Sequence, residues 1–175
     1  LIHHLTFANS LQAIDQEMYP TNINYDTTIP SPQSFLGRPL GSAPIRHHEL
    51  VDYLKLVASL SNRLSIETIG FSHERRPILF VVATSESNQN NIDAIKKQHI
   101  ALTEPKLNQN VNKNMPVVTW LNYGVHGAES SGMDAALPTV YHLAAAQGKE
   151  IDALLNNSVI LITAVFILEY AIILL

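Results

Sequence analysis

The chain has 175 residues, of which 46% are hydrophobic and 15% are charged, a composition typical of one globular domain and not of a disordered segment. The formal net charge is −4, and the 11 lysines and arginines form no basic stripe, which argues against a nucleic-acid partner. Because there is no cysteine, disulfides and thiolate metal sites are excluded, and any zinc must be bound by histidine and carboxylate.

The N-terminal part reads as a tail followed by an arm. Residues 1–13 are predicted to be a signal-peptide remnant or a disordered tail, because small residues end the segment but it has no basic start or apolar core. Five prolines between residues 19 and 44, among Thr, Ser and Asn, predict an extended arm lying over the surface.

Helical and extended patterns then follow one another along the chain. Apolar residues at helical spacing predict a helix over residues 46–62, and β-branched runs predict strands over 64–70 and 77–84 with a solvated loop between them. A second helix is predicted over 87–103, capped by Ser87 and Asn88. The apolar run 117–123 predicts a buried strand, with Trp120 and Tyr123 expected in the core.

A long helix capped by Ser130 and Ser131 is predicted to follow that strand and to reach about residue 147. On it, Asp134 is interpreted as a polar helix position, and His142 is expected at the surface. Earlier in the chain, His47 and His48 are also expected to be solvated, because adjacent residues on a helix point about 100° apart and do not share a metal ion.

His126 and Glu129 are the candidate metal ligands. They stand three residues apart directly after the predicted strand 117–123, and the glycines Gly124 and Gly127 on either side of the histidine favour a loop there. Zinc accepts imidazole nitrogen and carboxylate oxygen, and open α/β sheets place their ligands at the carboxyl ends of strands. A structural turn whose histidine is only hydrogen-bonded is the alternative.

The segment from Trp120 to Glu129 resembles the first metal-ligand segment of the zinc metallocarboxypeptidases, the carboxypeptidase A-like peptidases, and especially a secreted bacterial branch. Three more stretches resemble the same family in the same order. They are the hairpin 69–78, in which Arg75 replaces the usual glycine, the helix and turn at 144–155, and the strand at 157–162.

This resemblance implies a three-layer α/β/α sandwich with a mixed sheet over residues 14–166, and a zinc enzyme that removes C-terminal residues from peptides. In the family, the third zinc ligand, the general base and the carboxylate-binding residues lie further downstream. Ala128 stands where some members carry an arginine. The expectation is therefore a truncated, inactive form in which His126 and Glu129 are the zinc ligands and no catalytic residue is assigned.

Residues 167–175 form an apolar tail where the family continues into an Asn-Pro-Asp-Gly turn, and a frame slip after Phe166 is one hypothesis for it. The run 159–175 also allows a second class of function, a non-enzymatic membrane-anchored fragment, although Glu169 and the β-branched residues favour a buried strand. A zinc amidohydrolase that removes acyl groups from amino acids is a third interpretation. The family resemblance implies a secreted or periplasmic protein, and an exposed sheet edge together with the apolar tail makes self-association an expectation.

Overall fold

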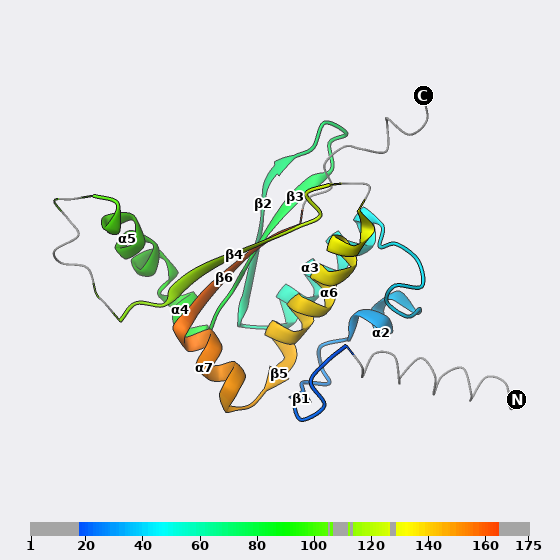
Figure 1. The fold of residues 1–175 in the computed structure, drawn as a ribbon, viewed down its shortest axis with the longest axis horizontal. Helices are drawn as coiled ribbons and strands as arrows, with labels where there is room; N and C mark the ends of the chain where they lie inside the picture. The colour runs from blue at the N-terminus through cyan, green and yellow to red at the C-terminus, as the bar shows by residue number, and fades with distance from the viewer. Residues whose placement is uncertain (1–17, 105, 107–111, 113, 127–128, 165–175) are drawn as a thin grey trace, which may run out of the picture.

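A computed structural model describes residues 18–104, 106, 112, 114–126 and 129–164 (Figure 1). The leader or tail predicted at residues 1–13 and the aberrant tail predicted at 167–175 both lie outside these residues. The boundaries drawn for the domain at 14 and 166 therefore remain predictions.

The centre of the fold is a four-stranded mixed sheet with the strand order β2-β3-β6-β4. Strands β2 (Leu64–Phe71) and β3 (Pro77–Ala83) form an antiparallel hairpin, and β3 pairs antiparallel with β6 (Ser158–Ala164). Strand β4 (Val117–Tyr123) runs parallel to β6 at the edge of the described sheet. The predicted strands and the mixed sheet are confirmed, and the structure adds their order.

Helices cover the two faces of this sheet (Figure 1). Helices α3 (His47–Leu60) and α6 (Ser130–Ala145) lie side by side on one face, and their inward residues form the core with β3 and β6. Helix α5 (Ile92–Leu102) lies over the opposite face, where it shares a cavity with all four strands. The predicted three-layer α/β/α arrangement is confirmed.

The helix predicted over 87–103 is divided into α4 (Glu86–Asn90) and α5, which meet at Asn91. The cap of α4 is Ser85, whose Oγ accepts a hydrogen bond from the Asn88 backbone N–H, so the prediction of Ser87 and Asn88 as caps was wrong. The Asn88 side chain instead donates to the hydroxyl of buried Thr84 and to the Leu155 carbonyl. This contact links the residue after β3 to the residues just before β6.

The proline-rich arm does not lie only on the surface, as was predicted, but contains secondary structure and contributes to the core. It contains β1 (Asn24–Tyr25), which pairs antiparallel with β5 (Ala146–Gln147), and the short helix α2 (Pro32–Leu36). Three of its apolar side chains, those of Ile29, Leu40 and Ile45, are buried in the main core. Helix α7 (Lys149–Asn157) then leads from β5 into β6.

The apolar run that allowed a membrane anchor begins as a strand of the sheet. Residues 159–164 belong to β6, which is paired on both sides, and Ile162 and Ala164 are buried. No helix within the described residues has the length and apolar character needed to cross a membrane.

Trp120 corrects the predicted core. Its side chain is 65% exposed on β4, because no element among the described residues covers this part of the α5 side of the sheet. The indole Nε1 donates to the Thr163 hydroxyl at 3.1 Å, and that hydroxyl donates to Asn122 Oδ1 at 2.5 Å. Tyr123, on the other face, is partly buried against the core as predicted.

His142 is half-buried, so the prediction of a surface position was wrong. Its Nδ1 lies 2.7 Å from the hydroxyl of Tyr25, which stacks on Tyr141 with ring centroids 5.2 Å apart. Burial lowers the pKa of His142 below its ordinary value. The unfolded chain therefore binds the proton more tightly than the folded chain does.

This difference predicts that the His142 contribution to stability is intact above about pH 6.5 and declines as the pH falls below that value. Urea unfolding of the wild type and of His142→Gln at pH 7.5 and 5.5 measures it. The midpoint of the wild type should fall more on acidification than that of the variant. His47, whose pKa is also lowered, chiefly by burial, remains in both proteins, so an equal fall would contradict the assignment to His142.

The β2-β3 hairpin turns through Ser72 to Arg76, and Arg75 is the only described non-glycine residue with a positive φ, at 63°. The left-handed conformation costs a residue with a Cβ about 1 kcal/mol, which explains why a glycine is usual at this position of the resembled hairpin. Arg75→Gly is therefore expected to raise the free energy of unfolding by about 0.5–1 kcal/mol. Chemical denaturation measures the change, and His73→Gly, in the same turn without a positive φ, should not stabilise.

Candidate metal site at the end of strand β4

The predicted ligands lie in a turn between β4 and α6. Strand β4 ends at Tyr123, and Gly124 follows with a φ of +68°, a conformation that glycine adopts without strain. The backbone N–H of Glu129 then donates to the His126 carbonyl at 3.1 Å, which closes a tight turn. Both side chains are exposed. The predicted loop at the carboxyl end of the strand is thus present, and a backbone hydrogen bond joins His126 to Glu129 within it.

A close contact between two glycines holds this turn against helix α6. A Cβ placed on Gly132 would lie 3.0 Å from the backbone nitrogen of Gly124, so a side chain there would require a shift of a few tenths of an ångström. Glu129 stands at the N-cap position of α6, so the helix begins directly after the turn. The prediction of Ser130 and Ser131 as caps was wrong, because both residues lie inside the helix. The contact of Gly132 with Gly124 was not predicted.

A side-chain hydrogen bond adds a second link between β4 and α6. The Thr139 hydroxyl donates to the Ala135 carbonyl at 2.8 Å, which leaves its oxygen to accept from the Tyr123 hydroxyl at 3.1 Å. Because Tyr123 is the last residue of β4, this bond fixes the strand end from which the turn departs.

The donor chemistry of the turn fits zinc in part. An imidazole nitrogen and a carboxylate oxygen are two ligands that zinc prefers, and catalytic zinc commonly has three protein ligands. Within the described residues no third histidine, aspartate or glutamate gathers with a pair to form a metal-binding group. The turn therefore supplies half of a site, and no step of chemistry can be assigned to other described side chains.

The other histidines and Asp134 take structural or solvated positions. His47 is half-buried, and its Nε2 donates to the Pro77 carbonyl at 3.0 Å, whereas His48 is exposed on the next helical position, as is His73 in the hairpin turn. Asp134 accepts the backbone N–H of Ile45 at 2.9 Å, which attaches the arm to α6. His48 and His73 match the prediction of solvated residues. The prediction that His47 is solvated was wrong, because its ring is half-buried and hydrogen-bonded. Asp134 is a polar helix position as predicted, and it also bonds the Ile45 backbone.

Comparison with known proteins gives one positive result. The family model described as zinc carboxypeptidase matches residues 50–166, from within α3 to just beyond β6. The match covers more than half of the chain and includes the turn with His126 and Glu129. No curated protein and no solved structure matches the chain.

Proposed function

The chain belongs to the zinc carboxypeptidase family, and we propose that His126 and Glu129 are two protein ligands of its catalytic zinc ion. The supporting observation is their position, in a tight turn at the carboxyl end of a sheet strand, where α/β folds place their ligands. The proposed reaction is hydrolysis of the C-terminal peptide bond of a peptide, in a secreted or periplasmic setting.

Bound zinc in such a site activates water and polarises the scissile carbonyl. The proposed part of this chain in that chemistry is to hold the ion through His126 and Glu129. Two observations support it: Gly124 has a positive φ after β4, and a backbone hydrogen bond joins His126 to Glu129. A proton acceptor for the water must be positioned within hydrogen-bond reach of it. We assign no described residue to that role.

From two ligands we infer that the 175-residue polypeptide by itself binds zinc weakly and does not hydrolyse peptides. A third ligand and a general base complete a catalytic site, and His126 and Glu129 supply neither. The test is release of a C-terminal amino acid from a chromogenic dipeptide, measured with added zinc. Zinc-dependent hydrolysis by the wild type that His126→Ala abolishes would overturn this inference.

We also propose that the polypeptide self-associates through strand β4. This strand lies at the edge of the described sheet, and Val117, Val118 and Trp120 on it are exposed. An exposed apolar edge strand is a template for pairing with another chain.

Val117→Lys is expected to shift the polypeptide toward monomer, because a charged side chain on an edge strand disfavours pairing. Sedimentation velocity over a range of concentrations measures the distribution. Leu154→Lys, which places the same charge on an exposed position of α7, is the matched control and should not change it. A wild type that is monomeric at every concentration contradicts the proposal.

A further inference from the structure

A basic cavity of about 890 Å³ lies beside the proposed zinc ligands, where the arm meets the first residues of α3, β3 and α6. Its charged lining consists of Arg38, Arg46 and Arg76 against a single carboxylate, Glu49. Ser130 also lines the cavity and directly follows Glu129 in the chain, so the cavity reaches the turn that carries the proposed ligands.

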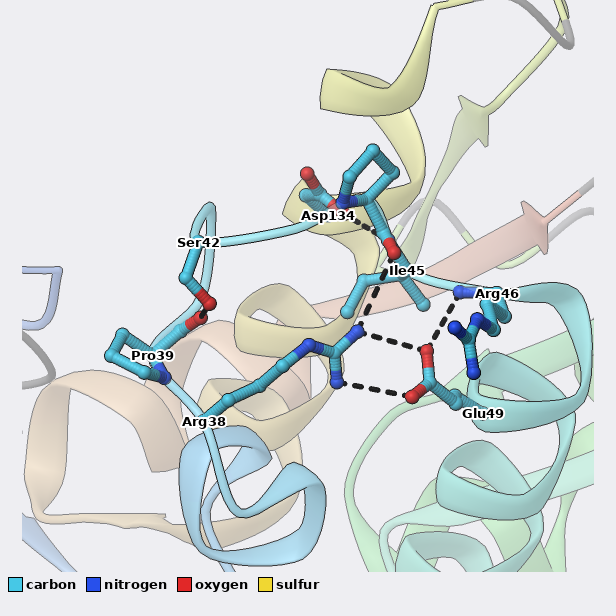
Figure 2. A network of polar contacts seen from close by, with 8 residues as sticks. Arg38, Pro39, Ser42, Ile45, Arg46, Glu49 and Asp134 are labelled. Atoms are coloured by element: carbon cyan, nitrogen blue, oxygen red, sulfur yellow. Dashed lines mark hydrogen bonds and ion pairs between the residues drawn. The ribbon is translucent and has the colours of Figure 1, made fainter.

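The one carboxylate of the lining is already occupied, as Figure 2 shows. Arg38 donates from both terminal nitrogens to the two oxygens of Glu49, at 3.0 and 2.9 Å, and the Arg46 backbone N–H donates to Oε2 at 2.8 Å. Burial raises the pKa of Glu49, but the Arg46 N–H and Arg38 outweigh it, so the pKa lies below its ordinary value. Glu49 therefore stays ionised at neutral pH and neutralises Arg38.

Arg46 and Arg76 are the two arginines of the lining that form no salt bridge with Glu49. The Arg46 side chain is exposed and makes no ion pair with any residue that the structure describes. Arg76 pairs with Glu74 at 2.7 Å, but these side chains are 45% and 50% exposed, and such pairs contribute little in water.

The positive charge around the cavity affects the pKa of His47, which also lines it. The pKa of His47 is lowered chiefly by burial, and the charges of Arg76 and His48 act in the same direction, against the Pro77 hydrogen bond, which raises it. His47 is therefore neutral near pH 7 and adds no charge to the cavity.

We propose that this cavity is an anion-binding subsite that takes an aspartate or glutamate side chain of the peptide substrate. The planar fork of a guanidinium matches a carboxylate, which favours an acidic residue over a neutral one. The volume is many times that of a single water, so it accommodates a side chain together with the adjoining peptide backbone. The role as a substrate subsite rests on the function proposed above, whereas the binding of acidic peptide does not.

The experiment measures binding of a fluorescent short peptide with two glutamates, acetylated and amidated at its ends, to the 175-residue polypeptide in EDTA. Fluorescence anisotropy gives the dissociation constant. The same peptide with glutamine in place of glutamate should bind at least about tenfold more weakly, because the charge-assisted hydrogen bonds are lost. Equal binding of the two peptides would overturn the proposal.

The double variant Arg46→Gln/Arg76→Gln should weaken binding of the acidic peptide about tenfold. The control Lys97→Gln/Lys106→Gln removes the same charge from exposed lysines outside the cavity and should leave the affinity within about twofold. An equal loss in both variants would show a nonspecific charge effect and contradict the subsite. If the arginine variant failed to fold, the affinities of the wild type for the glutamate and glutamine peptides would still test the proposal.

Inorganic phosphate separates a peptide carboxylate from a free anion as the ligand. Phosphate that binds where the glutamate peptide does not would overturn the proposal. The peptide titration is done in EDTA and so does not depend on zinc, whereas zinc binding is measured separately without EDTA. Binding of the acidic peptide together with a failure of His126 to bind zinc would refute the proposed function and leave the subsite intact. Zinc binding without acidic-peptide binding would do the reverse.

Discussion

His126→Ala is expected to weaken zinc binding by the polypeptide by a factor of about 10 to 100, the largest functional effect of any single substitution outside the core. Only two side chains of the turn offer ligand atoms, and removing the imidazole leaves one carboxylate oxygen. Glu129→Gln should produce a loss of similar size, because a neutral amide is a poor ligand for zinc. Competition with a chromophoric zinc indicator measures both affinities at neutral pH.

His48→Ala is the matched control for this experiment. It removes an exposed imidazole at the start of α3 that is not one of the proposed ligands, so zinc affinity should stay unchanged. If His48→Ala and His126→Ala reduced the affinity equally, the turn would not be the zinc site. If His126 and Glu129 bind one ion, the double variant His126→Ala/Glu129→Gln should lose little more zinc affinity than either single variant does.

Gly132→Ala is expected to lower the free energy of unfolding by about 1–3 kcal/mol. The new methyl group would lie 3.0 Å from the backbone nitrogen of Gly124, and a backbone atom cannot rotate away as a side chain can. Relief requires α6 to move away from the end of β4, and the turn between them would move as well. Zinc affinity should therefore fall together with stability. Urea unfolding and the indicator titration measure the two effects.

Gly70→Ala provides the control for this substitution. A Cβ on Gly70 meets nothing within 4 Å, and Gly70 lies in β2, remote in sequence from the turn. It should change stability by less than about 1 kcal/mol and leave zinc affinity unchanged. Equal destabilisation by the two substitutions would mean that the contact between Gly132 and Gly124 is not what fixes the turn.

Most of the secondary structure follows from local patterns. The helical spacing of Leu50, Leu54 and Val57 predicts α3, and the β-branched run that ends in Ala164 predicts β6, because burial of one face imposes those periods. The break at Asn91 was not predicted. The Asn88 side chain donates to the carbonyls of Leu155 and Asn156 in α7, a long-range contact that no local pattern reveals.

Errors at single residues have the same origin. Trp120 was predicted in the core because aromatic residues in an apolar strand are usually buried, yet the sheet face on which it lies is only partly covered by α5. His142 was predicted at the surface from its place near a helix end, but β1 crosses that end and brings Tyr25 within hydrogen-bond distance. The burial of Trp120 and that of His142 both depend on which distant segment of the chain packs against the residue.

The sequence by itself predicted most helices and strands from periodicity, and the candidate ligands His126 and Glu129 from their spacing and the neighbouring glycines, because these are local properties. The fold class and the family followed from the resemblance of four stretches to the zinc carboxypeptidases, which the family match confirms. Only the tertiary structure decided the strand order, the contact between Gly124 and Gly132, and the meeting of Arg38, Arg46 and Arg76 around one cavity. The strand order and the cavity join residues far apart in the chain, and the glycine contact joins a strand end to the helix that follows it. Their position is set by how the sheet and helices pack, which local sequence does not encode.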